Sequence, residues 1–252
     1  MYQMRRPAIH NVQVGNQRIS YQTLGDGDPV ILVHGLSGSL LWWSRNIQDL
    51  AQDHRVYLVD LPGFGSMRRV STRFTIMKAA QWLLAWMETV NIQKADFIGH
   101  SMGGYICIWI AAHHPALVSR LVLVSPAVLS EIRKIWGYAI PLLSTIAYLQ
   151  RDFFFILIYD ALRAGPLTLL QATYDLLSVD AQEEIARISV PTLLIWGEND
   201  TLVPPSIGHT LHTKLASSRL VILHNASHIS MYDQPAQFNA LVKAFFNGEG
   251  AG

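Results

Sequence analysis

Residues 96–104 read Asp-Phe-Ile-Gly-His-Ser-Met-Gly-Gly, and this stretch decides the fold. Gly99, Ser101 and Gly103 fit the pattern G-x-S-x-G, in which a serine sits on a sharp turn between a strand and a helix. The context agrees, because an apolar run of strand length precedes the turn and a helix-length segment, 104–112, follows it. A serine in this turn has a strained backbone, and a side chain two residues away would clash, so glycine is needed there. We therefore expect Ser101 to project above a sheet as a candidate nucleophile.

The rest of the chain repeats the same rhythm, with apolar runs of strand length separated by helix-length patterns. Short runs that are apolar on both faces are typical of a parallel sheet covered by helices, and their alternation with helices indicates an α/β fold. Ligands bind such sheets outside the carboxyl ends of the strands, so the informative residues should directly follow each strand. The predicted strands are 12–14, 18–24, 30–33, 56–59, 96–98, 121–124, 192–196 and 220–223, and helices are predicted over 74–89 and 234–246.

The rhythm breaks between residues 127 and 188. This segment shows no strand bounded by turns and is very apolar, as in the run 153–158. We expect a helical insertion over the sheet edge, with Gly165 and Pro166 separating two of its helices. The predicted domains are a core formed by 1–126 and 189–252, and a helical cap at 127–188.

The composition limits the partners and the compartment. Among 252 residues, 19 Lys and Arg face 18 Asp and Glu, and a net charge of +1 argues against a nucleic-acid partner. The single cysteine, Cys107, excludes an intramolecular disulfide and a cysteine metal cluster. The mean hydropathy of +0.23 is high, yet the longest uncharged run, 97–119, fits a buried strand, turn and helix better than a membrane span. Because residues 1–11 lack the apolar core of a signal peptide, we expect a cytoplasmic protein.

A candidate acid follows the predicted strand 192–196. Asp200 lies on the loop after that strand, where a carboxylate can orient an imidazole. Glu198 is the competitor, two residues earlier. We prefer Asp200 because a position beyond the turn at Gly197 reaches farther toward the site. By itself, an aspartate here would be read as a loop or helix cap.

A candidate base follows the last predicted strand. Of ten histidines, only His224 and His228 lie beyond it. His228 belongs to the loop before the final helix, from which an imidazole can reach over the sheet to Ser101. His224 sits at the strand end, where a structural role is the simpler interpretation. The spacing of the histidines gives no metal site.

A place for an oxyanion is predicted directly after the buried strand 30–33. We assign it to the backbone N–H groups of Leu36 and Met102. One such donor typically contributes ~10²–10³ in rate, because charge develops on the carbonyl oxygen only in the transition state. His34 is expected to brace this loop, and Ser37 and Ser39 are alternative residues for lining the pocket.

Together these features resemble the α/β-hydrolase superfamily, in its serine esterase and lipase-like branch with a helical cap. The resemblance spans 30–235 and is carried by His34-Gly35, the segment 60–65, Ser101, Asp200 and His228. It implies an α/β-hydrolase fold, a mostly parallel eight-stranded sheet with an antiparallel second strand and a cap after the sixth. It also implies that Asp60 and the glycines after it form a structural loop. Related dehalogenases and epoxide hydrolases have an aspartate at the elbow, so Ser101 argues against those reactions.

The expected function is hydrolysis of carboxylic esters through an acyl-enzyme, with Ser101, His228 and Asp200 as nucleophile, base and orienting acid. No metal or cofactor is needed, and the partner is a small-molecule ester. Substrate contacts are expected from the cap, whose apolar content favours short- to medium-chain acyl or alcohol groups and leaves room for peripheral contact with a lipid surface. One alternative is carbon–carbon bond hydrolysis of meta-cleavage products, although the segment 229–232 lacks the tryptophan associated with that branch. Another is a ligand receptor on the same fold.

Overall fold

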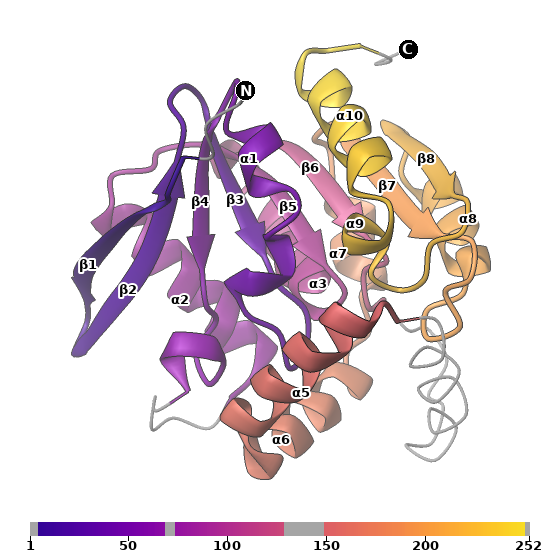
Figure 1. Cartoon of the computed structure of the whole chain (residues 1–252). Coiled ribbons are helices and arrows are strands. Elements are labelled where there is room, and N and C mark those ends of the chain that lie inside the picture. The colour runs from indigo at the N-terminus through magenta and orange to yellow at the C-terminus, as the bar shows by residue number, and fades with distance from the viewer. Residues whose placement is uncertain (1–4, 69–73, 129–148, 250–252) are drawn as a thin grey trace.

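The apolar runs form one sheet. The computed structural model describes residues 5–68, 74–128 and 149–249 (Figure 1). In these ranges eight strands are ordered β1-β2-β4-β3-β5-β6-β7-β8; β2 is antiparallel to both neighbours, and all other pairs are parallel. The predicted sheet, including its antiparallel second strand, is therefore confirmed. The strands are β1 (Ala8–Val14), β2 (Gln17–Leu24), β3 (Pro29–Val33), β4 (Arg55–Val59), β5 (Ala95–His100), β6 (Val118–Val124), β7 (Thr192–Gly197) and β8 (Ser218–Leu223).

Each central strand contributes to two apolar cores. In β3, Val30 and Leu32 pack into one core, whereas Ile31 and Val33 pack into the other. This follows from the alternation of side chains along a strand, and it explains why the run is apolar throughout. Both faces of the sheet are covered by helices, as the pattern predicts.

Helices cover the two faces in separate layers (Figure 1). The first layer contains α2 (Ile76–Thr89), α3 (Met102–His113) and α8 (Pro205–Lys214). The second contains α1 (Ile47–Leu50), α9 (Ser230–Asp233) and α10 (Pro235–Phe246). Short 3₁₀ turns at η1 (Leu40–Trp43), η2 (Gly65–Met67) and η3 (Pro115–Leu117) complete the connections. The last helix begins at Pro235, one residue after its predicted start at 234, and α9 lies between it and His228.

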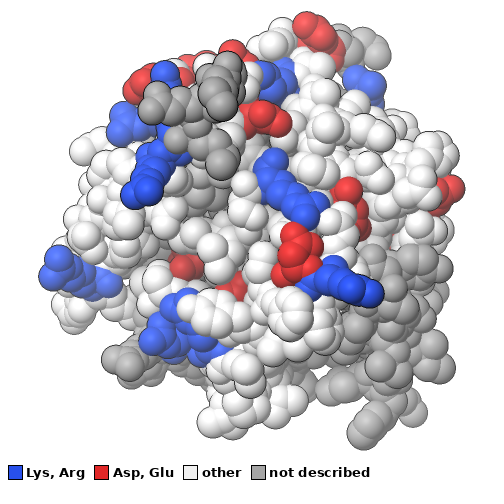
Figure 2. Space-filling view, viewed as in Figure 1, with Lys and Arg blue, Asp and Glu red and all other residues white. Residues whose placement is uncertain are grey.

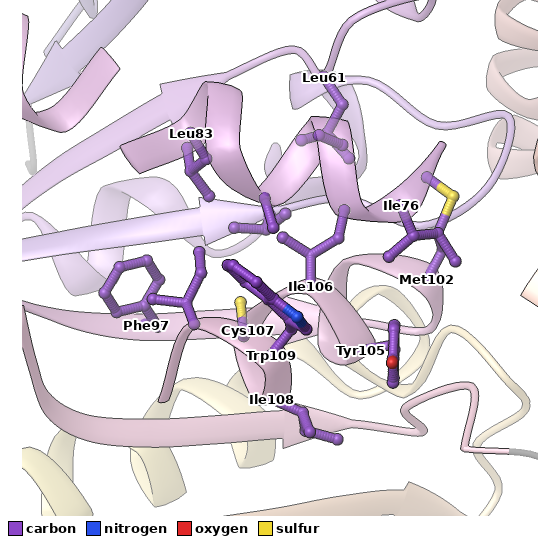
Figure 3. Packing of buried hydrophobic residues seen from close by; sticks show 14 of the residues in the cluster. Leu61, Ile76, Leu83, Phe97, Met102, Tyr105, Ile106, Cys107, Ile108 and Trp109 are labelled. Carbon is purple, nitrogen blue, oxygen red and sulfur yellow. The ribbon is translucent and has the colours of Figure 1, made fainter. Parts of the chain in front are cut away.

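Helix α3 lies at the centre of the first core. Its residues from Met102 to Ala111 are buried on every side, and Figure 3 shows Ile106 and Cys107 in the same cluster of buried side chains as Phe97 of β5. A helix packed all round needs no polar face. The uncharged run 97–119 is thus a buried strand, turn and helix, as expected.

In the described residues between β6 and β7, the chain forms three helices. They are α5 (Arg151–Ala164), α6 (Pro166–Leu177) and α7 (Gln182–Arg187). The predicted break at Gly165 is confirmed, since α5 and α6 meet there at 98°. In Figure 1 they lie below the carboxyl ends of the central strands, whereas α7 packs against α3. The predicted cap also includes 129–148, which lie outside the described residues, so its extent stays a prediction.

None of the helices in the described ranges is, by itself, both long enough and apolar enough to cross a membrane.

Candidate active site

Ser101 occupies the turn between β5 and α3. Its φ of 51° and ψ of −117° form a backbone conformation that residues with a side chain rarely adopt. Hydrogen bonds hold it there: its N–H donates to the carbonyl of Val124 at 2.9 Å, and its own carbonyl accepts from Tyr105 at 3.2 Å and Ala127 at 3.0 Å. The strain is therefore maintained by β6 and by the first turn of α3.

The glycines on each side of Ser101 are required by close contacts. A Cβ atom at Gly99 would lie 2.6 Å from the carbonyl oxygen of Gly103. A Cβ at Gly103 would lie 2.4 Å from the carbonyl oxygen of Val33 and 2.5 Å from that of His34. Backbone from β5, α3 and the end of β3 therefore meets at this turn with no room for a side chain.

Asp200 and His228 are in direct contact. Nδ1 of His228 lies 2.8 Å from Oδ2 of Asp200, and both side chains are buried. The other carboxylate oxygen of Asp200 accepts hydrogen bonds from the N–H groups of Leu202 at 3.0 Å and Val203 at 2.9 Å. Because these donors leave Oδ2 to accept from the imidazole, Nδ1 of His228 carries a proton and Nε2 is free to accept one.

The loops that carry these two residues are joined by backbone contacts beyond β7 and β8. The N–H of Glu198 donates to Leu223 at 2.9 Å, and that of Asn199 donates to Ala226 at 2.8 Å. A Cβ at Gly197 would lie 2.1 Å from the carbonyl oxygen of Ser227, so only glycine permits this approach. The pairing of the two loops fixes Asp200 relative to His228.

Glu198 has a different partner. Its carboxylate lies 3.3 Å from Nδ1 of His224, and both side chains are exposed. The pKa of Glu198 is lowered mainly by the backbone N–H of Asn225 and, to a smaller extent, by the side chain of His224. The structure therefore joins Glu198 to His224 at the surface and Asp200 to His228 in the interior.

His228 is held against the residue that precedes Ser101. The rings of His100 and His228 have centroids 4.8 Å apart, and Nε2 of His100 donates to the backbone carbonyl of His228 at 2.9 Å. Burial, with a further contribution from His228, lowers the pKa of His100 well below its usual value, so its ring is neutral. The structure thus brings the loops of Asp200 and His228 to the turn at Ser101.

The loop after β3 lies beside the same turn. A Cβ at Gly35 would be 2.8 Å from Nδ1 of His100 and 3.1 Å from Cβ of Ser101. Leu36 is the next residue in this loop, and Met102 begins α3 directly after Ser101. The two backbone N–H groups expected to bind an oxyanion are therefore carried by segments that adjoin Ser101.

His34 braces this loop, as expected. The N–H of Leu61 donates to Nε2 of His34 at 3.0 Å, so Nδ1 must carry the ring proton and donate to the carbonyl of Gly35 at 2.8 Å. Burial lowers the pKa of His34 and keeps it neutral. Asp60 has a similar structural role, because its carboxylate accepts from the N–H groups of Leu40 at 2.8 Å and Ser66 at 2.7 Å.

Asp160 is a buried carboxylate near the site that sequence reasoning missed. Its Oδ2 accepts from Oγ of Ser39 at 2.8 Å and from Nε1 of Trp42 at 3.1 Å, whereas Oδ1 has no hydrogen-bond partner among the described residues. The ring of Trp42 lies 5.5 Å from that of His100. Burial raises the pKa of Asp160 to about 6. The available signal was a single carboxylate in the otherwise uncharged run 153–162.

The described part of the chain has no group of three His, Cys, Asp or Glu side chains that could hold a metal ion.

Proteins with curated names align with most of the chain, among them an esterase and a component of an acetoin cleaving system. A pimeloyl-[acyl-carrier protein] methyl ester esterase of Aeromonas hydrophila is 28% identical over 253 residues, which cover 90% of this chain and 98% of the relative. The dihydrolipoyllysine-residue acetyltransferase component of an acetoin cleaving system of Pseudomonas putida is 28% identical over 268 residues, which cover 96% of this chain and 70% of the relative.

A solved structure is similar along its whole length. A variant of the meta-cleavage product hydrolase CumD of Pseudomonas fluorescens superposes with a TM-score of 0.77 at 25% identity, covering 95% of this chain and 98% of that one. Its name adds the hydrolysis of meta-cleavage products to the reactions named among proteins similar to this chain.

Two family profiles match the chain. The profile of the alpha/beta hydrolase fold matches residues 28–157, and that of a serine hydrolase family (FSH1) matches residues 97–230. Each match covers just over half of the 252 residues, and both include the strained turn at Ser101. With the sheet order and the residues gathered at its carboxyl end, this shows that the chain belongs to the α/β-hydrolase fold family.

Proposed function

We propose that the protein hydrolyses carboxylic esters whose acyl or alcohol group is apolar and short to medium in length. The observation that carries the proposal is the 2.8 Å contact between Asp200 and His228, held against the strained turn at Ser101. A buried carboxylate, an imidazole and a serine on such a turn are the groups that a two-stage acyl transfer requires.

In the first stage, Oγ of Ser101 attacks the ester carbonyl while its proton passes to Nε2 of His228. Asp200 accepts the Nδ1 proton in a hydrogen bond, which holds this tautomer and stabilises the imidazolium. The backbone N–H groups of Leu36 and Met102 bind the oxyanion. His228 then gives its proton to the leaving alcohol, and the acyl group remains on Ser101.

In the second stage, His228 takes a proton from water, and the hydroxyl adds to the acyl carbonyl. Collapse of this intermediate breaks the bond to Ser101, which recovers its proton from His228, and the acid is released. Each proton that the imidazole accepts is returned, so the cycle needs no further co-reactant.

The apolar substrate class is supported by the inner face of the cap. Phe153 of α5 packs 5.1 Å from the ring of Trp42, which itself lies 5.5 Å from His100. Partly buried Ile156 and Leu157 pack against the same core. Aliphatic and aromatic side chains next to His100, the residue before the nucleophile, favour apolar groups over sugars or phosphates.

The test is a panel of p-nitrophenyl esters from acetate to laurate, assayed with the natural chain and with Ser101→Ala. We expect turnover of the shorter and middle members and a loss of about 10⁶ in kcat on substitution, as in serine hydrolases that lose their nucleophile. Circular dichroism should show the variant folded. Equal turnover by both proteins, or none by the natural chain on this panel or on glyceryl esters, would contradict the proposal.

A second candidate is hydrolysis of a carbon–carbon bond, favoured by the similarity to CumD. The same serine and histidine would act on a ring-cleavage dienoate, whose carboxylate needs polar groups to bind it. An assay that follows the loss of dienoate absorbance beside the ester panel separates the two reactions. If the dienoate is turned over faster than every ester of the panel, the substrate class is the ring-cleavage product instead of the ester, and Ser101 keeps its role as the nucleophile.

A further inference from the structure

The outer face of α5 and α6 concentrates the exposed apolar side chains of the protein. Ten large hydrophobic residues are exposed in the described part of the chain, and seven of them lie on these two helices. Leu162 and Leu167, on either side of the bend, are 77% and 74% exposed. The other three, Ile9, Leu41 and Met77, lie singly on different elements. Scattered residues of this kind are ordinary, whereas a group of seven marks an interaction surface.

This surface presents no charge. Residues 153–179 contain three charged side chains, and none of them is exposed. Asp160 is buried, Asp175 accepts the N–H of Ile76 at 2.6 Å, and the half-buried Arg163 donates to the carbonyl of Gly65 at 3.1 Å. Figure 2 shows the region of α5 and α6 almost entirely white, with blue and red atoms at its margins.

The margins carry exposed basic groups beside the exposed acidic groups of Asp152 and Asp180, and the surface carries amphipathic aromatic rings. Arg68 is exposed directly after η2, which packs against α5, and Lys78 is exposed in α2, which packs against α6. Tyr159 and Tyr174 are exposed within the surface. Tyrosine suits the boundary between hydrocarbon and headgroups, and Lys and Arg beside it suit phosphate groups.

We infer that the outer face of α5 and α6 docks on the surface of a phospholipid bilayer, with the leucines at the 98° bend inserted among the acyl chains. Neither helix is long enough to cross, and an amphipathic pair with one uncharged face lies in the interface instead. An ordinary protein–protein interface carries about ten hydrogen bonds, whereas the exposed polar side chains of these two helices between residues 153 and 177 are Tyr159, Gln171 and Tyr174.

Docking in this orientation brings the site close to lipid. The opposite side of α5 carries Phe153 and Asp160, both of which contact Trp42 beside His100. The helix that lies on the bilayer thus also packs against Trp42, whose ring contacts His100, the residue before the candidate nucleophile. It follows that the substrates include esters dissolved in the membrane, and this clause alone rests on the proposed function.

The experiment measures co-sedimentation with phosphatidylcholine vesicles, with and without anionic phosphatidylglycerol, using the full chain carrying Ser101→Ala. We expect binding to the neutral vesicles, tighter binding to the anionic ones, and a fall in the partition coefficient of about 100-fold with Leu162→Glu and Leu167→Glu together, roughly tenfold for each leucine removed from the acyl chains. The matched control is Ile9→Glu, which adds the same charge at a 67% exposed apolar residue of β1 and should bind as the parent does.

Four outcomes would overturn the inference. The first two are that the parent does not bind vesicles, and that the double variant binds as well as the parent. The third is binding to anionic vesicles alone that is lost at high salt. The fourth is that the parent binds no vesicles but forms a dimer in analytical ultracentrifugation, whereas the double variant is a monomer. With Ser101 intact, the double variant should keep the parent's turnover of a soluble short-chain ester. Because sedimentation uses the inactive Ser101→Ala chain, failure of docking and failure of ester hydrolysis are read separately.

Discussion

The positive φ of Ser101 costs free energy that its surroundings must offset. Strained backbone of this kind typically costs about 1–3 kcal/mol, and here three hydrogen bonds and two flanking glycines hold it. This backbone conformation places the hydroxyl of Ser101 at the N-terminus of α3, where the helix dipole favours developing negative charge. Local structure and chemistry therefore depend on the same five residues, 99–103.

Gly103→Ala tests this dependence. In an ordinary helix this change stabilises by about 0.5–1 kcal/mol, but here the new Cβ would lie 2.4 Å from the carbonyl of Val33. We expect the free energy of unfolding to fall by about 1–3 kcal/mol. Ester turnover should fall too, because the displaced segment carries the loop of Leu36. Urea denaturation measures the first effect, and a melting temperature at or above that of the natural chain would show that the close contact does not matter.

Asp200→Asn tests the assignment of the acid. An asparagine at this position presents its amide to the imidazole and favours the wrong tautomer, so kcat should fall by about 10⁴ with little change in KM. Glu198→Gln is the matched control, because Glu198 lies two residues away and pairs with His224 at the surface. Steady-state kinetics on one ester compares them, and a larger loss in the control would reverse the assignment.

Among single residues, the sequence could predict those that follow a strand and that come in the chain order nucleophile, acid, histidine. Ser101, Asp200 and His228 each come directly after an apolar run, so topology alone places them at one end of the sheet. Asp160 could not be predicted in the same way. Its partners Ser39 and Trp42 are 121 and 118 residues distant in the chain, and no local pattern announces the contact.

Among the elements, α5 has two faces with opposite surroundings. Its inner face buries Phe153 and Asp160 against the core, and its outer face exposes Phe155 and Leu162. A buried carboxylate in such a helix is costly unless it is hydrogen-bonded or protonated. Ser39 and Trp42 each donate a hydrogen bond to Oδ2 of Asp160, whereas Oδ1 is buried with no hydrogen-bond partner among the described residues. Burial therefore favours the protonated form of this carboxyl group.

The pH dependence of stability should reveal Asp160. Burial, more than the nearby Asp60, raises its pKa to about 6 from the 3.8 of an exposed aspartate. The folded protein therefore binds this proton more tightly, and the group's contribution to the free energy of unfolding falls as pH rises between about 4 and 6. Asp160→Asn lacks this loss, so relative to the natural chain it should gain at most about 3 kcal/mol between pH 4 and pH 7.

Urea denaturation at pH 4, 5, 6 and 7 measures this difference, with the exposed Asp26→Asn as the control. The control should follow the natural chain at every pH. A difference between Asp160→Asn and the natural chain that stays constant from pH 4 to pH 7 would mean that Asp160 has an ordinary pKa.

Element positions could be predicted well where a strand is apolar on both faces, and less well elsewhere. The edge strand β1 begins at Ala8 rather than near residue 12, because its first half pairs with β2 although its side chains are exposed. The short helix α9 was not expected at all. Its four residues are too few for a periodic pattern, and backbone contacts such as that of Asp233 with Ile229 define it.

At the scale of the whole molecule, buried amides join the first third of the chain to the last helix. Nδ2 of Asn46 donates to the carbonyl of Met231 and to Oδ1 of Asn239, both at 2.9 Å. Asn239 in turn donates to Asp49 at 2.7 Å. Residues 46 and 239 are 193 positions apart, and nothing in either local sequence marks them as partners. The sheet was predictable from its hydrophobic pattern, whereas the hydrogen bonds between Asn46 and the last helix arise only in the tertiary structure.

Asn46→Ala should therefore destabilise the whole fold. Two buried acceptors would lose their donor, at a cost of about 2–4 kcal/mol in the free energy of unfolding. Gln52→Ala is the matched control, since exposed Gln52 also bonds to the last helix, through Lys243 at 2.9 Å, and should change stability by less than about 0.5 kcal/mol. Thermal and urea unfolding compare them, and equal losses would show that burial of the amide is unimportant.

Cys107 is the one cysteine of the chain, and its thiol lies beneath the serine turn, so close to Gly99 that an added Cβ would be 2.7 Å from the sulfur. Burial raises the pKa of this thiol, which leaves almost no thiolate to react. Cys107 should therefore react very slowly with maleimides, so that a cysteine introduced at the surface would be labelled selectively. A fluorophore attached through Leu162→Cys would be the sole label, and its emission would register directly whether that position sits in water or in hydrocarbon.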